Sequence, residues 1–269
     1  MKRIISLTSI PPRFAHIGPT LESLLAQGAD EVRLYVPPSY RRFPDWDGEM
    51  PRVPGGVAIR RCDQDYGPAT KILPACLEMQ GEDVQILFCD DDGTFAPGWA
   101  DRLFSLQAER PDDAVAGYVR PAEGYVPNVV KLLKEPRARE IPIRRDLRYR
   151  SARLLQRVFG GPVPWRRPIV RAGYGEILFG VGGAVVRPHF FDKRAYDIPD
   201  EAWAVDDVWL SANLARCHIA ILSPRRHPMP REGNHASMSA LLDVQTVFGG
   251  RQESNIIAAE FCKNEFGIW

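Results

Sequence analysis

The stretch Val84–Thr94, VQILFCDDDGT, joins a continuous apolar run to three adjacent aspartates. An apolar run of this length, bounded by charge, is typical of a strand that is buried on both faces of a parallel sheet. Asp90, Asp91 and Asp92 therefore follow the carboxyl end of a buried strand, where open α/β sheets bind their ligands. Because crowded like charges cost energy unless a cation or a raised pKa relieves them, the stretch predicts a ligand site.

Strand and helix patterns alternate on both sides of this stretch, which predicts a mostly parallel, doubly wound α/β sheet flanked by helices. We expect strands at residues 3–9, 31–36, 57–61, 84–89, 177–186 and 218–222. We expect helices at residues 20–27, from about 68 to 77, 99–109 and 206–216.

Composition is that of a folded globular protein, with 45% hydrophobic and 26% charged residues in a chain of 269. The net charge of +1 gives the whole chain no bias toward nucleic acid or acidic membranes. The apolar run at residues 4–10 is short and stops at Pro11-Pro12, so a first strand is expected rather than a signal peptide. Five cysteines without a CxxC pair predict buried thiols in a reduced, cytoplasmic protein.

Positive charge is concentrated at residues 131–171, which hold 13 Lys and Arg against Glu135, Glu140 and Asp146. We expect low regularity here. The stretch suits an anionic acceptor, such as an acidic glycan or a lipid-linked phosphate, or contact with an anionic membrane at its inner face. A solvated loop is the alternative. Sparse aromatic residues argue against nucleic acid as a partner.

The three aspartates fit two kinds of chemistry. One is a site for Mg²⁺ or Mn²⁺ with a nucleotide diphosphate, because hard cations take oxygen ligands, usually one or two carboxylates with phosphates and water. The other is the DxDGT motif of haloacid-dehalogenase-like phosphatases, in which Asp90 would be phosphorylated and Asp92 would be the acid/base. That motif normally follows the first strand of its fold, whereas some three strand–helix units precede it here. A solvated acidic turn is the third alternative.

Three segments in order resemble the donor-binding half of bacterial GT-A glycosyltransferases of the family 2 type. They are SIPPRF at 9–14, DQDYGPATK at 63–71 and DDDGTFAPGW at 90–99. The resemblance covers roughly residues 4–110 and resumes at 175–215. It implies one GT-A domain over 1–269, with a nucleotide-sugar-binding half (1–115), a basic insertion (116–172) and an acceptor and catalytic half (173–269).

The resemblance implies a role for each matching residue of the donor site. Asp90 and Asp92 would hold Mn²⁺ or Mg²⁺ on the diphosphate of a nucleotide-diphosphate sugar, and Lys71 would add a positive charge near the phosphates. The other implied donor contacts are Arg13 to nucleotide or phosphate, Asp63, Asp65 and Tyr66 to base and ribose, Asp91 to ribose or sugar, and Gly182 and Gly183 to the sugar. A surface arginine, a solvated lysine and a tight glycine bend are the structural alternatives.

The segment DDVWLS at 206–211 resembles the one that supplies the catalytic base in inverting GT-A enzymes. It implies Asp207 as the base, with Asp206 second; an acidic helix N-terminus is the alternative, and its dipole opposes a raised pKa.

His227 or His235 would complete the metal shell, with His235 favoured. The resemblance implies inverting transfer of a sugar to a hydroxyl of a surface glycan or lipid-linked precursor. A phosphatase or a non-catalytic sugar-nucleotide- or anion-binding module remains the alternative.

Overall fold

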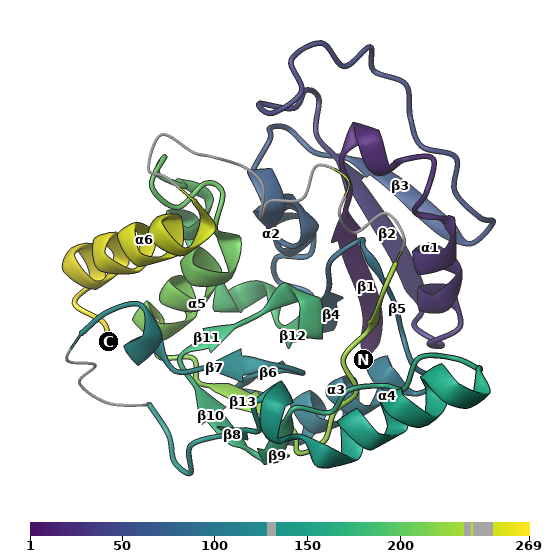
Figure 1. Ribbon diagram of the computed structural model, residues 1–269. Coiled ribbons are helices and arrows are strands. Elements are labelled where there is room, and N and C mark those ends of the chain that lie inside the picture. Colours follow the sequence, from purple (N-terminus) through teal and green to yellow (C-terminus); the bar gives the residue numbers. More distant parts are fainter. Residues whose placement is uncertain (128–132, 234–237, 239–249) are drawn as a thin grey trace.

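The computed structural model describes residues 1–127, 133–233, 238 and 250–269, and its centre is one eight-stranded sheet (Figure 1). The strand order is β10-β13-β6-β12-β4-β1-β2-β3. The strands are β1 Lys2–Thr8, β2 Glu31–Val36, β3 Val57–Arg61, β4 Val84–Phe88, β6 Ala114–Ala116, β10 Gly173–Gly175, β12 Ala184–Val186 and β13 Ile221–Ser223.

The sheet has a parallel half and a mixed half. β3, β2, β1 and β4 run parallel to one another. β12 is antiparallel to both β4 and β6, β13 is parallel to β6, and β10 is antiparallel to β13. Every residue of β4 is buried, as its apolar run predicted. The α/β class with a central, largely parallel sheet is therefore confirmed.

Helices cover both faces of the sheet. They are α1 Gly18–Leu25, α2 Leu73–Glu78, α3 Trp99–Glu109, α4 Leu147–Phe159, α5 Asp206–Arg216 and α6 Arg251–Phe266. On one face, side chains of α1 and α3 pack with Leu87 of β4. On the other, α2 and α5 pack with Ile86 and Phe88. This alternation follows from the period of two along a strand, and α6 packs on the outer side of α5 (Figure 1).

The observed ends of some helices and strands match the predicted ends, and others do not. β2, β3 and α3 have the predicted bounds. The helix expected from about residue 68 is divided into a 3₁₀ turn, Gly67–Lys71, and α2. β6 and α6 were not predicted, because β6 is too short to show alternation and α6 carries little amphipathic periodicity.

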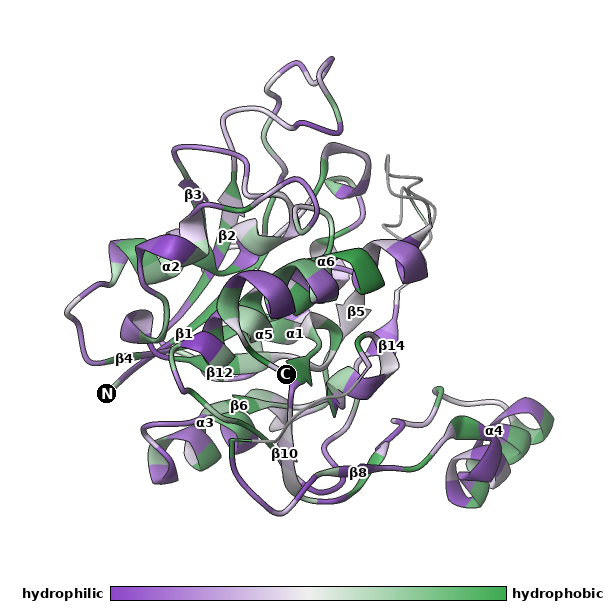
Figure 2. Ribbon diagram, turned by 90° about the vertical axis from the view of Figure 1, so that its left-hand side faces the viewer, coloured by the Kyte–Doolittle hydropathy of each residue, from purple (hydrophilic) through white to green (hydrophobic). Residues whose placement is uncertain are grey.

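The basic insertion is more regular than its sequence indicated. The two-residue strand β8, Arg139–Glu140, pairs with β9, Ile169–Arg171, and between them lies α4. The Asp146 side chain accepts a hydrogen bond from the Tyr149 amide at 3.1 Å and thereby caps this helix. Figure 2 shows α4 standing apart from the body of the molecule.

The described residues include no helix that is both long and apolar enough to cross a membrane. The five cysteines are free thiols; Cys76, Cys89 and Cys262 are buried, and Cys62 and Cys217 are half-buried.

Candidate active site

A cleft lies at the carboxyl ends of β1 and β4, where the sequence predicted a ligand site. It brings together most of the predicted site residues, although they come from distant parts of the chain. Those that line it are Arg13, Asp65, Lys71, Asp90, Asp91, Asp92, Asp206 and Asp207. We call the five aspartates at positions 90–92 and 206–207 the acidic cluster.

Lys71 joins the two segments of the acidic cluster. It ends the 3₁₀ turn that precedes α2, and its Nζ lies 2.5 Å from Asp90 Oδ1 and 2.8 Å from Asp206 Oδ2. Its side chain is buried. Burial alone would lower the pKa of Lys71, but the carboxylates of Asp206, Asp90 and Asp207 together raise this pKa well above its ordinary value. The lysine is therefore a permanent positive charge between the carboxylates.

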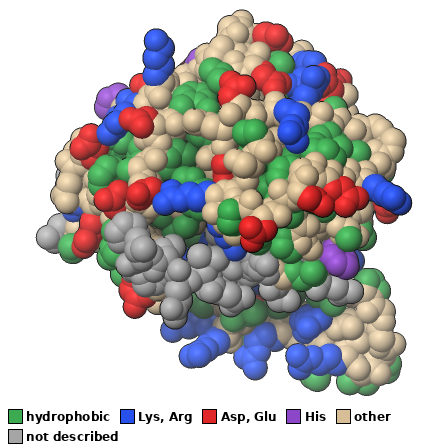
Figure 3. All heavy atoms as spheres, turned by 90° about the horizontal axis from the view of Figure 1, so that it is seen from above, with side chains coloured by type: hydrophobic (Ala, Val, Ile, Leu, Met, Phe, Trp, Pro, Cys, Tyr) green, Lys and Arg blue, Asp and Glu red, His purple; other side chains and the backbone are tan. Residues whose placement is uncertain are grey.

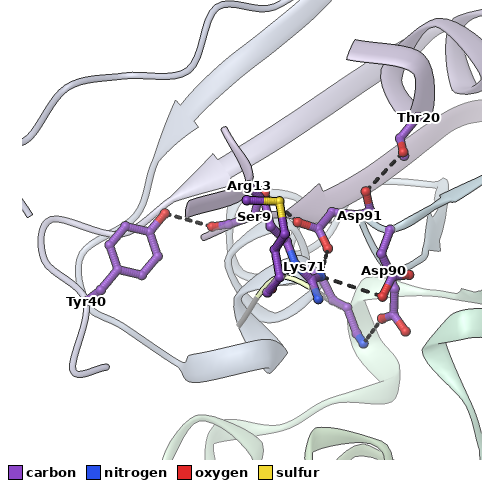
Figure 4. A network of polar contacts seen from close by, with 9 residues as sticks. Ser9, Arg13, Thr20, Tyr40, Lys71, Asp90 and Asp91 are labelled. Carbon is purple, nitrogen blue, oxygen red and sulfur yellow. Dashed lines mark hydrogen bonds and ion pairs between the residues drawn. The ribbon is translucent and has the colours of Figure 1, made fainter. Parts of the chain in front are cut away.

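Asp91 is held by a network of polar contacts (Figure 4). Its carboxylate lies 2.5 Å from Arg13 Nη1 and accepts a hydrogen bond from the Ser9 hydroxyl. Its carbonyl accepts a hydrogen bond from Thr20 Oγ1 at 3.0 Å, and the Tyr40 hydroxyl donates to the Ser9 carbonyl at 2.8 Å. Asp91 is buried, so in this structure it fixes the loop that carries its two neighbours. Its predicted contact with ribose or sugar stays a prediction.

Asp92 carries a charge that the protein leaves poorly compensated. Burial, together with the neighbouring charges of Asp90 and Asp91, raises the pKa of Asp92 to about 7. Arg13 Nη1 is 3.6 Å from Asp92 Oδ2 and offsets the effect only in part. The Asp92 carbonyl accepts a hydrogen bond from the Gly233 amide at 2.7 Å. The backbone at Asp92 is therefore fixed, while its carboxylate would gain from a nearby cation.

Asp207 is the buried carboxylate at the first turn of α5. Its Oδ1 accepts a hydrogen bond from the Gly180 amide at 2.8 Å, which fixes the orientation of the carboxylate. Burial and the adjacent Asp206 raise the pKa of Asp207 to about 7. A helix N-terminus favours the ionised carboxylate, but here desolvation and like charge outweigh it. A carboxylate with a pKa near neutral has the basicity that a general base needs.

Gly180 is the glycine that approaches the acidic cluster. A Cβ atom at this position would lie 2.3 Å from Lys71 Nζ and 2.7 Å from Asp90 Oδ1, so a side chain would displace the ion pair. The predicted Gly182 and Gly183 lie outside the described set of cleft-lining residues. A Cβ at Gly182 would meet Tyr118, and one at Gly183, which has φ +71, would meet Trp99. Both serve close packing in this structure.

Of the three residues expected to contact the nucleotide base and ribose, one lines the cleft and two do not. Asp65 lines the cleft, and its carboxylate accepts hydrogen bonds from the amides of Arg41 and Gly67, both at 2.8 Å. Asp63 is exposed and is not among the described residues that line the cleft. Tyr66 is buried in the core, where its ring packs edge-on against Tyr196 with centroids 6.1 Å apart.

Aromatic and charged residues that belong to no motif complete the cleft. They are Tyr40, Arg42, Phe43, Trp203, Glu232 and Arg251. Tyr40, Arg42 and Phe43 come from the Pro- and Arg-rich loop that follows β2, and no motif in the sequence of that loop indicated a site. Glu232 arrives through the short strand β14, Arg231–Glu232, which pairs antiparallel with β5, Gly93–Thr94, directly after the three aspartates.

His227 lies in the core instead of the cleft. Its ring is fully buried 5.9 Å from that of Trp99, and burial lowers its pKa to about 3. Within the described part of the chain, it is not one of the residues that line the cleft with Asp90. His235, the favoured metal ligand, lies outside the described residues.

Among the described residues, no group of three or more His, Cys, Asp or Glu side chains is arranged to hold a metal ion by itself. Mg²⁺ sites usually have only one or two carboxylates, with water and substrate phosphates as the other ligands. Asp90 and Asp92, which both line the cleft, stay predicted as such a pair of oxygen ligands.

No protein-family model and no curated protein matches the chain. Among solved structures, it is similar to the crystal structure of S. aureus TarS, with 15% identity and a TM-score of 0.43, over 86% of this chain and 37% of that one. It is also similar to the crystal structure of S. aureus TarS 1-349, with 12% identity and a TM-score of 0.43, over 99% of this chain and 72% of that one. The chain thus spans well under half of the first of these proteins. Identities and TM-scores this low assign neither a family nor an activity.

Proposed function

We propose that this chain is a metal-dependent glycosyltransferase that moves a sugar from a nucleotide-diphosphate sugar to an acceptor hydroxyl, with inversion. The observation that carries the proposal is the position of Lys71, whose ammonium group pairs with both Asp90 and Asp206 in a cleft at the carboxyl edge of the sheet. The residues predicted for the donor site and the carboxylate predicted as the base come from separate segments, and they line one cleft, which supports the proposal.

Asp90 and Asp92 would hold the metal ion. The raised pKa of Asp92 supports this assignment, because a divalent cation would relieve the repulsion that raises it. When bound, the ion would supply positive charge that neutralises the negative charge developing on the leaving diphosphate. Lys71 would lie beside the same phosphates, since its buried ammonium group pairs with Asp90.

Asp207 would act as the general base. Its carboxylate would accept the proton of the acceptor hydroxyl while the hydroxyl oxygen bonds to the anomeric carbon of the sugar. The bond from that carbon to the diphosphate oxygen breaks in the same step, and the nucleoside diphosphate leaves. The Gly180 amide fixes the orientation of the carboxylate, and its pKa of about 7 suits proton transfer near neutral pH.

A thermal-shift screen of UDP-, GDP-, CMP- and dTDP-sugars, with and without Mn²⁺, tests the donor site. We expect one nucleotide class to raise Tm, and to do so only with the metal, because a ligand that binds the native state stabilises it by mass action. A matched screen of Asp92→Asn and of the exposed-surface control Asp112→Asn assigns the effect to the cleft. No response to any donor would contradict the proposal.

Two further outcomes separate this function from its alternatives. Trapping of a phosphoryl analogue on Asp90 would establish a phosphatase and overturn the proposal. Donor binding without transfer to any hydroxyl acceptor, unaffected by Asp207→Asn, would indicate a binding module instead of an enzyme.

A further inference from the structure

The helix α4 has its apolar and polar faces the wrong way round for a helix that covers a protein core. A surface helix ordinarily turns its apolar stripe inward and its charges outward. Among the described residues, α4 buries none of its side chains. Several large apolar side chains of this helix are strongly exposed: Leu147 is 72% exposed, Val158 66% and Phe159 80%.

The exposed apolar side chains form one stripe. At about 100° per residue, Leu147, Leu154 and Val158 fall within a narrow sector of the helix, and Leu155 and Phe159 widen it on one side. All five are exposed. The side chains on the opposite sector, Tyr149, Ala152, Arg153 and Gln156, are half-buried. The polar and mixed side of α4 is therefore its less exposed side, and its apolar stripe faces outward.

Arginines border the apolar stripe. Arg150 and Arg157 lie along one edge of it, and Arg148 lies within its wider side, at an angle between those of Leu155 and Phe159. All three are exposed. In Figure 3, where this part of the molecule forms the lower margin, Lys and Arg side chains gather beside hydrophobic ones. Asp146, the one acidic residue in the sequence from 141 to 171, is the buried N-cap of the helix, and its single negative charge offsets only part of this positive charge.

We propose that α4 is a membrane-docking helix that lies in the interface of an anionic lipid bilayer. An apolar stripe flanked by arginines is the pattern of helices whose apolar face enters the boundary between headgroups and acyl chains. Arginine stems can lie along the apolar surface while their guanidinium groups reach the lipid phosphates. The excess of positive charge selects an anionic surface as the occupant, and the proposal holds whatever reaction the cleft catalyses.

The arm that carries α4, residues 139–171, is attached at the rim of the cleft. The guanidinium carbon of Arg231 lies 3.8 Å from the centroid of the Trp165 ring, and the Met229 amide donates to the Arg166 carbonyl at 2.8 Å. Arg231 belongs to β14 and pairs with Thr94, and the next residue, Glu232, lines the cleft. A membrane bound by α4 is therefore connected to the cleft through a short, hydrogen-bonded path.

Vesicle flotation tests the proposal with the full chain. The vesicles are phosphatidylcholine alone and phosphatidylcholine with phosphatidylglycerol. We expect the chain to float with the anionic vesicles, and binding to weaken as salt is raised. The variant Leu154→Gln/Val158→Gln/Phe159→Gln should bind at least about tenfold more weakly, because it removes the apolar contribution. Arg148→Gln/Arg157→Gln should also lose about tenfold.

Matched controls make the same chemical changes elsewhere. Leu77→Gln replaces a half-exposed leucine of α2, and Arg52→Gln/Arg60→Gln removes the same charge from an exposed site near β3. Both should bind as the unchanged chain does. The proposal would be overturned if the triple variant of Leu154, Val158 and Phe159, the stripe variant, bound the anionic vesicles as tightly as the unchanged chain does. It would also be overturned if the unchanged chain floated with neither kind of vesicle. So would a dimer in light scattering that the stripe variant dissociates without any vesicle binding, because a second copy would then cover the stripe.

Discussion

The acidic cleft and the α4 arm differ in the burial of their charged and apolar side chains. In the cleft, five carboxylates are gathered beside Lys71 and Arg13, and most of these groups are buried. On the arm, arginines and large apolar side chains are both exposed. Burial makes a charge expensive unless it is paired, so the cleft is built around ion pairs and two carboxylates with raised pKa values. The arginines of the arm are exposed to solvent and need no such pairing. Its exposed apolar and basic surface is the one proposed to contact a membrane.

The largest expected effect is in the cleft. Asp207→Asn should lower kcat of transfer by about 10²–10⁴-fold, the range that general-base catalysis contributes. Tm at pH 8 should not fall, because the change removes a buried, like-charged carboxylate while keeping its shape. Steady-state kinetics and calorimetry measure both, with Asp112→Asn as the surface control. Unchanged kcat in Asp207→Asn would mean that another residue is the general base.

A smaller loss of activity is expected from Gly180→Ala. The added Cβ would collide with Lys71 Nζ and Asp90 Oδ1, which form a partly buried ion pair. We expect roughly tenfold weaker donor binding, of the order of one lost charge-assisted hydrogen bond. Gly124→Ala is the matched control, since within the described residues a Cβ there meets no atom within 4 Å. Equal donor affinity in the two variants would mean that the ion pair does not shape the site.

The raised pKa of Asp207 predicts a pH-dependent difference in stability. Its pKa rises from 3.8 to about 7 on folding, so the native state binds more protons than the unfolded state between these values. The contribution of Asp207 to the free energy of unfolding therefore falls as pH rises through this window. In urea denaturation, the free energy of unfolding of Asp207→Asn minus that of the unchanged chain should rise by more than about 1 kcal/mol from pH 4 to pH 7. One pKa unit corresponds to about 1.4 kcal/mol. A constant difference would argue against the raised pKa.

The smallest effect is expected on the arm. Leu154→Gln/Val158→Gln/Phe159→Gln should change the free energy of unfolding by less than about 0.5 kcal/mol, because the exposed side chains lose no packing. Leu210→Ala, a fully buried residue of α5, should cost about 2–5 kcal/mol and serves as the contrast. Chemical denaturation of both variants measures this. A large cost for the stripe variant would mean that the stripe packs against the protein itself.

The sequence predicted the parallel half of the sheet well, because buried strands such as β4 are long, apolar and followed by charge. It also predicted that Asp90 and Asp207 belong to one site, but only by family resemblance. The ion pair of Lys71 with both segments depends on the tertiary fold, and no local pattern specifies it.

Other features of the site escaped sequence reasoning for physical reasons. Gly182 and Gly183 were expected at the ligand, but close packing against Tyr118 and Trp99 accounts for them, and Gly180 approaches the cluster instead. His227 is a core residue beside Trp99. The outward apolar stripe of α4 could not be foreseen, because periodicity locates an apolar face but not the direction in which it points.

The most direct test of the central claim is calorimetric titration of Mn²⁺ in the presence of a nucleoside diphosphate, at pH 6 and pH 8. A metal held by Asp90 and Asp92 should bind more tightly at pH 8, where Asp92, with its pKa of about 7, is ionised. Asp92→Asn should lose most of the affinity together with its pH dependence, while Asp112→Asn keeps both. Tight binding that is equal in Asp92→Asn and in the unchanged chain would show that the acidic cluster is not the metal site.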